Sequence, residues 1–165
     1  MIKEVSGDIL LSKAEAIAHS VAPFDHFDSG LALSLREQWP SMFKDFKHYC
    51  HQYNPKTGSA WLWGSASGLR IVNLLTQEPS SNKGHGGHPG LATLSNVTHA
   101  LGDLKKIISK EGIRSIALPR LASGVGGLDW EEVKPLFYSQ LGDLNALVFV
   151  YSTFVKGQQA VETAV

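Results

Sequence analysis

The segment from Leu118 to Asp129 has the residue types of an anion-binding loop. An apolar run ends at Leu118, small residues occupy positions 122–127, and a helical pattern follows Asp129. Glycines let backbone N–H groups approach an anion, and a following helix adds a dipole that favours negative charge. No Gly-Lys-Ser/Thr follows, so the segment is not a Walker loop, but a diphosphate is a natural occupant. The alternative is a tight turn that needs glycine only for its geometry.

Two further turns carry candidate ligand-binding residues. Ser29, Gly30 and Leu31 open a helical pattern, where their backbone could hold the same anion from the other side. An N-capped helix is the alternative interpretation. Asp8 follows the candidate strand Ile2–Val5, and a carboxylate at such a position can accept a hydrogen bond from the exocyclic amine of a base. Here the alternative is a turn stabilised by the aspartate.

Histidines are the candidate proton-transfer groups, because an imidazole pKa of about 6.5 lies near neutrality. His19 stands near the end of the apolar run Ala16–Val21, where a hydrogen-bonded core histidine is the alternative. His26 lies in the polar loop that follows. His85 and His88 lie in a glycine-rich segment whose spacing permits metal binding, but no carboxylate or cysteine accompanies them. We therefore expect no bound metal.

Strand and helix patterns alternate along the chain, which predicts a three-layer α/β/α fold with a mixed, mostly parallel sheet. The expected strands are Ile2–Val5, Ala16–Val21, Ala60–Ser65, Arg70–Leu75, Ser115–Leu118 and Leu147–Tyr151. Helices are expected from Gly30 to Trp39, from Met42 to Gln52, over the apolar positions from Leu91 to Ile108, and from about Asp129 onward. Ligands of such sheets bind at the carboxyl ends of strands, where all three candidate loops lie.

Length and composition indicate one globular domain. The chain has 165 residues with 15 basic and 15 acidic side chains, a balance that gives no reason to expect sequence-independent binding to nucleic acid or membranes. We expect the domain over residues 1–155 and a frayed or loosely helical tail over residues 156–165. The single cysteine excludes an internal disulfide, and no signal-peptide core or 20-residue apolar run occurs. We expect a cytoplasmic monomer.

Together these segments resemble the macrodomain family. The matching segments are Gly7-Asp8-Ile9, Ile17-Ala18-His19-Ser20, Ser29-Gly30-Leu31-Ala32, Leu118-Pro119-Arg120 and Ser123-Gly124-Val125-Gly126. The resemblance covers roughly residues 1–152. It is nearest to the branch that holds the ADP-ribose-1″-phosphate phosphatases and the terminal ADP-ribose glycohydrolases, and Ala18-His19-Ser20 is its most specific pointer.

The resemblance implies an ADP-ribose site. Asp8 would bind the adenine amine, the glycine loop would wrap the diphosphate, and His19 would lie near the distal ribose. The implied ligand-binding residues are Asp8, Ile9, Ser20, Ser29, Gly30, Leu31, Ser123, Gly124, Val125 and Gly126. For catalysis, His19 would act as acid or base, with Asp28, His26 or His85 assisting. No cofactor or metal is implied, and the expected partner is ADP-ribose or an ADP-ribosylated protein or nucleic acid, not a membrane.

Two departures bear on the reaction. Glycohydrolases of this branch use a lysine after the central strand, where this chain has Gln77, and an aspartate in the late glycine loop, where it has Gly126 or Gly127. The resemblance therefore does not carry a covalent lysine mechanism to this chain, and Lys83 is the nearest alternative lysine. Three interpretations stay open: a hydrolase acting on the distal ribose, a non-catalytic ADP-ribose-binding module, and a domain that binds another anionic nucleotide.

Overall fold

The computed structural model describes residues 1–80, 89–124 and 126–163. In this part of the chain a six-stranded sheet has the order β1-β6-β5-β2-β4-β3. Its strands are β1 (Ile2–Gly7), β2 (Ala16–Val21), β3 (Ala60–Gly64), β4 (Arg70–Leu75), β5 (Ser115–Pro119) and β6 (Leu147–Phe154). Neighbouring strands are parallel except for β3 and β4, which are antiparallel. The mixed, mostly parallel sheet predicted from the alternating pattern is confirmed.

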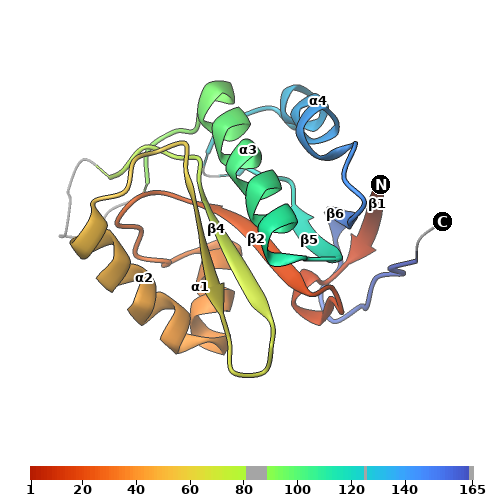
Figure 1. Cartoon of the computed structure of the whole chain (residues 1–165), viewed down its shortest axis with the longest axis horizontal. Helices are drawn as coiled ribbons and strands as arrows, with labels where there is room; N and C mark the ends of the chain where they lie inside the picture. Colours follow the sequence, from red (N-terminus) through yellow and green to blue (C-terminus); the bar gives the residue numbers. More distant parts are fainter. Residues whose placement is uncertain (81–88, 125, 164–165) are drawn as a thin grey trace.

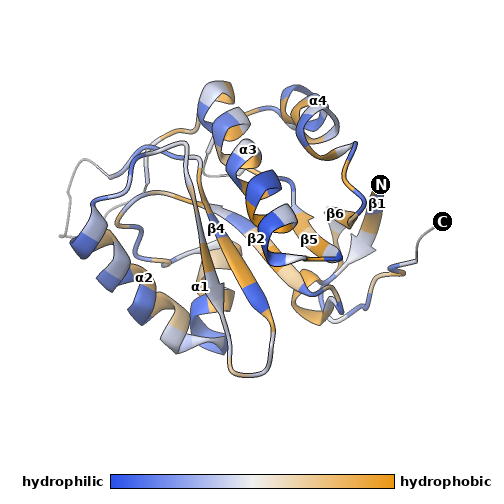
Figure 2. Cartoon of the chain, viewed as in Figure 1, coloured by the Kyte–Doolittle hydropathy of each residue, from blue (hydrophilic) through white to orange (hydrophobic). Residues whose placement is uncertain are grey.

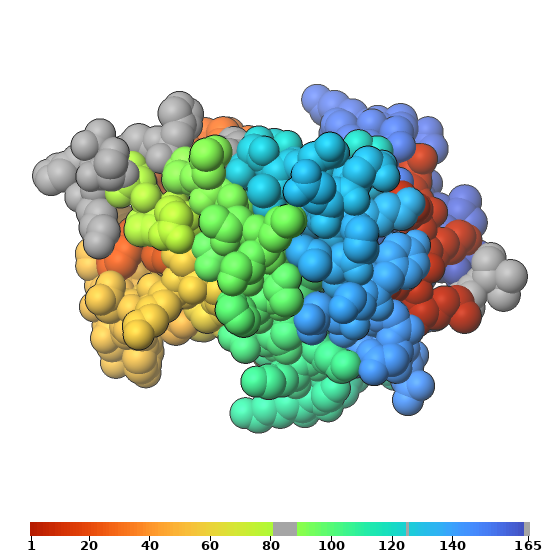
Figure 3. Space-filling view, turned by 90° about the horizontal axis from the view of Figure 1, so that it is seen from above, coloured from red at the N-terminus to blue at the C-terminus, as the bar shows by residue number. Residues whose placement is uncertain are grey.

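Helices cover both faces of the sheet (Figure 1). The helices are α1 (Gly30–Gln38), α2 (Pro40–Tyr53), α3 (Leu94–Glu111) and α4 (Trp130–Leu141), and a short 3₁₀ helix, η1, spans Ile9–Leu11. In Figure 3, α3 and α4 lie side by side across one face of the molecule. Within the described ranges, no helix combines the length and the hydropathy that crossing a membrane requires.

The start of α3 differs from the expectation. The helix begins at Leu94 because the side chain of Thr93 accepts a hydrogen bond from the Asn96 N–H and caps it. Leu91 therefore lies outside the helix and is 67% exposed, although it continues the apolar spacing. The helix ends at Glu111, and its C-cap residue Gly112 has a φ of +66°, a left-handed conformation that favours glycine.

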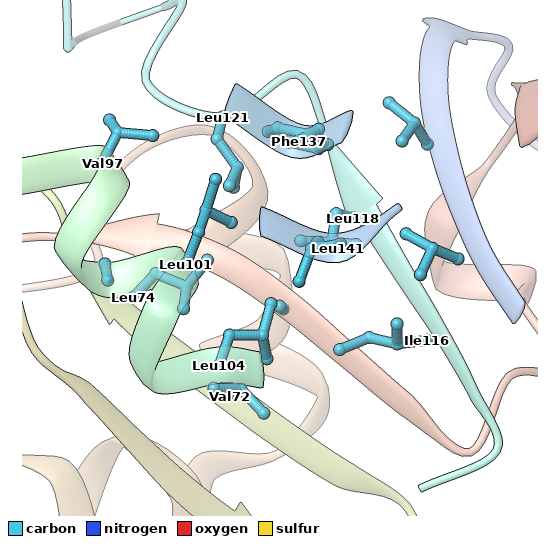
Figure 4. Packing of buried hydrophobic residues seen from close by; sticks show 14 of the residues in the cluster. Val72, Leu74, Val97, Leu101, Leu104, Ile116, Leu118, Leu121, Phe137 and Leu141 are labelled. Carbon is cyan, nitrogen blue, oxygen red and sulfur yellow. The ribbon is translucent and has the colours of Figure 1, made fainter. Parts of the chain in front are cut away.

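Alternate residues of each central strand face opposite helix pairs. Val72 and Leu74 of β4 pack under α3 and α4, whereas Ile71 and Leu75 pack under α1 and α2. Figure 4 shows Leu101 and neighbouring side chains of α3 pointing at this first face. Figure 2 shows β4 and β5 largely in the colour of hydrophobic residues, whereas α3 alternates between hydrophobic and hydrophilic residues. This two-sided burial explains why the sequences of the central strands are mostly apolar.

Residues 156–163 are packed against the domain and contain no helix, which differs from the frayed or loosely helical tail that was expected. Residues after β6 run in an extended path over the start of the domain, and Ala160 is only 7% exposed within a cluster that includes Val5 and Ile17. The close approach depends on Gly7, because a Cβ there would lie 2.8 Å from the backbone nitrogen of Ala160. The tail is thus part of the packed structure.

Candidate ligand-binding groove

Two cavities lie where β1, β2 and β5 end. The first, which we call the Asp8 cavity, has a volume of about 480 Å³. The second, the His19 cavity, has a volume of about 360 Å³. Both are lined by Gly30, Leu31 and Pro119, so the two cavities adjoin, and we refer to them together as the groove. The groove thus occupies the place at which parallel α/β sheets bind ligands.

Asp8 is 7% exposed and lies directly after β1. Its Oδ1 accepts a hydrogen bond from the Leu10 N–H at 3.1 Å, and its Oδ2 accepts one from the Gly157 N–H at 3.0 Å. The aspartate-stabilised turn is therefore present. It does not exhaust the carboxylate, which offers about four acceptor positions, and the residue still lines the cavity. Phe154, 67% exposed, lines the same cavity from the end of β6.

Gly124 and Gly126 of the glycine loop are glycines for different structural reasons. A Cβ on Gly124 would have no atom within 4 Å, so this residue faces open space along the His19 cavity. A Cβ on Gly126 would lie 2.6 Å from the Ala122 carbonyl oxygen, so the turn closes only with glycine there. Ala122 itself has a φ of +61°, an uncommon conformation for a residue with a side chain. The loop is a tight turn that leaves backbone exposed beside the cavity.

The helix after this loop contributes less to anion binding than the sequence suggested. The side chain of Asp129 accepts a hydrogen bond from the Glu131 N–H and caps α4. Glu131 and Glu132 add negative charge to the first turn. Because these carboxylates already satisfy and neutralise the positive end of α4, the loop's own N–H groups are the better anion donors.

The beginning of α1 forms the opposite wall. Ser29 is the N-cap residue, yet its side chain makes no capping hydrogen bond. Gly30 has a φ of +59°, and a Cβ on it would meet nothing within 4 Å. Both residues line the His19 cavity. The N-capped interpretation of this turn therefore lacks its defining hydrogen bond, and the helix N-terminus is left beside the cavity.

His19 projects from β2 toward the α1 and α2 side and is 1% exposed. Its Nε2 lies 2.7 Å from Asn73 Oδ1, and its ring meets Phe27 edge-to-face at 5.4 Å. Burial lowers the pKa of His19 to about 4, so the ring is neutral near pH 7. A hydrogen bond to an amide oxygen requires the ring nitrogen to donate, which places the proton on Nε2 and the lone pair on Nδ1.

Two of the buried polar atoms without a partner belong to the His19–Asn73 pair. Within residues 1–80, 89–124 and 126–163, the buried side-chain atoms without a hydrogen-bond partner are His19 Nδ1, Ser20 Oγ, Asn73 Nδ2 and Thr76 Oγ1. They come from the adjacent ends of β2 and β4, which pair in register. Buried polar groups are usually satisfied, so this cluster marks the carboxyl end of the sheet centre as unusual.

Asp25 and Gln77 are among the polar residues that line the His19 cavity but were not predicted as site residues. The Asp25 carboxylate accepts hydrogen bonds from the N–H groups of Ala22 and Phe27 at 3.0 and 2.9 Å, and burial raises its pKa. The signal available was its place two residues after a proline, in a turn that a side-chain carboxylate can stabilise. Gln77 donates from Nε2 to the Gly90 carbonyl at 3.2 Å and is 5% exposed. The sequence identified this position only as a departure from the glycohydrolases.

The structure brings most of the sequence-predicted site residues to the groove. Those lining the Asp8 cavity are Asp8 and Ile9, those lining the His19 cavity are His19, Ser20, Ser29, Gly124 and Gly126, and those lining both are Gly30 and Leu31. Ser123 turns back and donates to the Leu121 carbonyl at 3.2 Å, and the exposed Asp28 lines neither cavity. His85 and Val125 lie outside the described residues. Across the described ranges, no group of three histidine, cysteine or acidic side chains is placed to hold a metal ion.

The structure is an α/β/α domain with a groove at the carboxyl ends of its parallel strands. The Macro domain family model matches residues 22–137, and the chain belongs to this family. The macrodomain of Thermus aquaticus DarG superposes with a TM-score of 0.80 at 27% identity, covering 92% of this chain and 98% of that one.

Curated relatives include enzymes. A DNA ADP-ribosyl glycohydrolase of Mycobacterium tuberculosis is 31% identical over 168 residues, which covers 98% of this chain and 45% of that protein. An ADP-ribose 1''-phosphate phosphatase of Candida albicans is 21% identical over 140 residues, covering 81% of this chain and 90% of that protein. The chain thus spans less than half the length of the glycohydrolase that it matches.

Proposed function

We propose that this chain binds ADP-ribose or a derivative along the groove, with the adenine in the Asp8 cavity and the distal ribose in the His19 cavity. The observation that carries the proposal is the sharing of Gly30, Leu31 and Pro119 by the two cavities, which suits an elongated ligand with a diphosphate at its middle. Relatives named for ADP-ribosyl and ADP-ribose chemistry support the choice of ligand.

At the adenine end, the Asp8 carboxylate accepts a hydrogen bond from the exocyclic amine. Phe154 offers an exposed aromatic surface at the cavity mouth against which a base can stack. Ile9, 5% exposed, contributes apolar wall beside them. A carboxylate with an aromatic neighbour recognises a base that carries an amine in preference to one that carries a carbonyl oxygen.

At the middle, the diphosphate lies between the glycine loop and the start of α1. Gly124 presents backbone without a side chain, and Gly30 does the same on the facing wall. Backbone N–H groups suit this task because they supply hydrogen bonds to phosphate oxygens without a mobile side chain. The first N–H groups of α1 lie beside the cavity and add the positive end of a helix dipole.

Thermal unfolding with ADP-ribose tests binding. A ligand that binds only the native state raises the free energy of unfolding by about 2.7 kcal/mol at a concentration of 100 times Kd. We expect a concentration-dependent rise in Tm with ADP-ribose and a smaller one with ribose 5-phosphate. If neither Tm nor a calorimetric titration responds to millimolar ADP-ribose, the binding proposal is overturned.

A second candidate function is hydrolysis of a group from the distal ribose, favoured by the unpartnered polar atoms of His19 and Asn73. In such a reaction water adds across the bond that breaks. A phosphate ester or an acyl ester yields ADP-ribose and free phosphate or the carboxylic acid, and an ADP-ribosylated protein or nucleic acid yields ADP-ribose and the unmodified macromolecule. His19 in its neutral form has a lone pair on Nδ1, so the geometry favours a proton acceptor over a proton donor. Gln77 supplies no nucleophilic amine for a covalent route.

Binding is the better supported function because the His19 Nδ1 atom is buried in the described structure. Incubation with ADP-ribose-1″-phosphate, O-acetyl-ADP-ribose, ADP-ribosylated protein and ADP-ribosylated DNA separates the candidates. A hydrolase releases product from at least one substrate and loses that activity in His19→Ala. The affinity of His19→Ala for ADP-ribose should stay within about threefold of the wild type, a smaller change than the loss of one hydrogen bond would cause. A wild-type protein that binds all four substrates and releases nothing is a reader module.

A further inference from the structure

Glu162 is the hydrogen-bonding centre of the C-terminal segment. Its Oε2 accepts from the Ser12 and Tyr151 hydroxyls, each at 2.6 Å, and its Oε1 accepts from the Lys13 N–H at 2.8 Å. Burial and the neighbouring carboxylate raise the pKa of Tyr151, so its hydroxyl keeps the proton that it donates. Three donors on one carboxylate hold the end of the chain against the residues that follow η1 and against β6.

The same segment reaches Asp8 four to five residues earlier. The Gly157 N–H donates to Asp8 Oδ2 at 3.0 Å, and the Asp8 N–H donates to the Gln158 carbonyl at 2.7 Å. Between these bonds and Glu162, Ala160 is buried against Gly7. Asp8 is therefore held through both its backbone and its side chain by residues about 150 positions away in sequence.

We propose that residues 157–162 form a strap that positions the Asp8 carboxylate for recognition of the base, with Glu162 as the positioning residue that keeps the strap closed. This inference rests on the proposed function. With the strap in place, Leu10 and Gly157 each occupy one carboxylate oxygen, so the carboxylate cannot rotate. The acceptor that the cavity presents to the ligand then has a fixed direction.

A fixed acceptor distinguishes bases better than a mobile one. Adenine presents an amine that donates to Asp8, whereas hypoxanthine presents a carbonyl oxygen that the carboxylate repels. If the strap loosens, the carboxylate can turn away from the carbonyl and the penalty against hypoxanthine falls. Tyr151 lines the same cavity and is held by the same Glu162, so loosening affects this wall of the base site as well.

Calorimetric titration with ADP-ribose and with inosine diphosphate ribose tests the strap. The wild type should bind ADP-ribose about tenfold or more tightly than inosine diphosphate ribose, the difference expected for one hydrogen bond to a charged group. Asp8→Ala should remove this preference. Glu162→Ala should lower the preference by at least about threefold, with Glu162→Gln intermediate because its amide keeps one acceptor. Ribose 5-phosphate affinity should not change. Gln159→Ala is the matched control, since this strap side chain is exposed.

Hydrogen exchange provides a readout without ligand. The Asp8 amide is bonded to Gln158, so its exchange should accelerate by about tenfold or more in Glu162→Ala and stay as in the wild type in Gln159→Ala. Unchanged exchange in Glu162→Ala, or faster exchange with unchanged base preference, overturns the strap alone. A wild type that does not distinguish the two ligands overturns the strap and the proposed base site together.

Discussion

The two ends of the groove differ in how completely their polar groups are satisfied. At the Asp8 end, both carboxylate oxygens and the backbone N–H of Asp8 have partners, and the strap covers them. At the other end, His19 and Ser20 each have a buried atom without a partner among the described residues. Buried polar groups without a hydrogen-bond partner lower the stability of the fold, so proteins usually retain them where they serve a function. The first end is built to hold one geometry, and the second keeps unused hydrogen-bonding capacity.

Backbone strain follows the same division. Phe24 and Phe27 have φ values of +60° and +53° in the loop before α1, and Ala122 has +61° in the glycine loop. A left-handed conformation costs a residue with a side chain about 1 kcal/mol or more. All three belong to the loops at the His19 end. This difference leads us to expect that substitutions at the Asp8 end change selectivity, whereas substitutions at the His19 end change phosphate contacts, stability and reactivity.

The largest expected effect is at the glycine loop. Gly124→Glu should weaken ADP-ribose binding by about a thousandfold. The reason is that a glutamate carboxylate about 4 Å from a phosphate repels it by about 4 kcal/mol near a protein surface. Calorimetry measures the affinity and circular dichroism the fold. Gly124→Ala is the control and should keep its fold and lose much less affinity than Gly124→Glu, since its Cβ meets no protein atom and its φ is not in the left-handed region. A folded Gly124→Glu protein with wild-type affinity would place the phosphates elsewhere.

The next effect concerns the pH dependence of stability. The folded-state pKa of His19 is about 4, below its ordinary value near 6.5, so the unfolded chain binds a proton that the folded chain does not. This contribution is complete above pH 6.5 and is lost as pH falls toward 4. Relative to His19→Gln, the wild type should lose about 3 kcal/mol of unfolding free energy between pH 7 and pH 4.

Urea denaturation across this range measures the difference. His48→Gln, on an exposed position of α2, serves as the control and should track the wild type. Parallel curves for the wild type and His19→Gln would mean that His19 takes up its proton in the folded protein, and the contrast between the two ends of the groove would then lose its basis at this end.

Asp8→Ala should weaken ADP-ribose binding by about 1.5–3 kcal/mol, the cost of losing a hydrogen bond to a charged acceptor. Ribose 5-phosphate, which has no base, should lose little. Glu37→Ala, which removes an exposed carboxylate from α1, controls for the change in net charge. Equal losses for both ligands in Asp8→Ala would show that Asp8 acts on the whole groove and not on the base.

The smallest effect is at Ser29. Because its side chain makes no capping hydrogen bond, Ser29→Ala should leave the free energy of unfolding within about 0.5 kcal/mol of the wild type. ADP-ribose affinity should fall by about 1 kcal/mol if the hydroxyl contacts the phosphates. A loss of stability near 1 kcal/mol with unchanged affinity would assign Ser29 to the helix instead of the groove.

The sheet and its ligand-binding edge could be predicted because they depend on local pattern. Ala16–Val21 and Arg70–Leu75 were placed correctly, since strands buried on both faces read as short apolar runs. The rule that ligands bind at the carboxyl ends of strands then located Asp8 and the glycine loop. By contrast, the pairing of His19 with Asn73 depends on the register of β2 against β4, which no local pattern records.

The strap is the part of the structure that the sequence predicted least well. Residues 156–163 are mostly polar and lack periodicity, so the sequence favoured a frayed end. Their place is set by contacts with Gly7, Asp8 and Ser12 at the other end of the chain. The composition of a segment reflects only its own residues, so it does not reveal a segment whose position depends on partners that are distant in sequence.

The claim that the two cavities form one binding site is tested most directly by titrating ADP-ribose, AMP and ribose 5-phosphate into the wild-type protein under one condition. We predict that ADP-ribose binds more tightly than AMP by at least about 1.4 kcal/mol, or tenfold, and more tightly still than ribose 5-phosphate, because it alone occupies both ends of the groove. Equal affinities for ADP-ribose and AMP would show that the His19 cavity is not used by the ligand, and the absence of heat with all three would contradict the site as a whole.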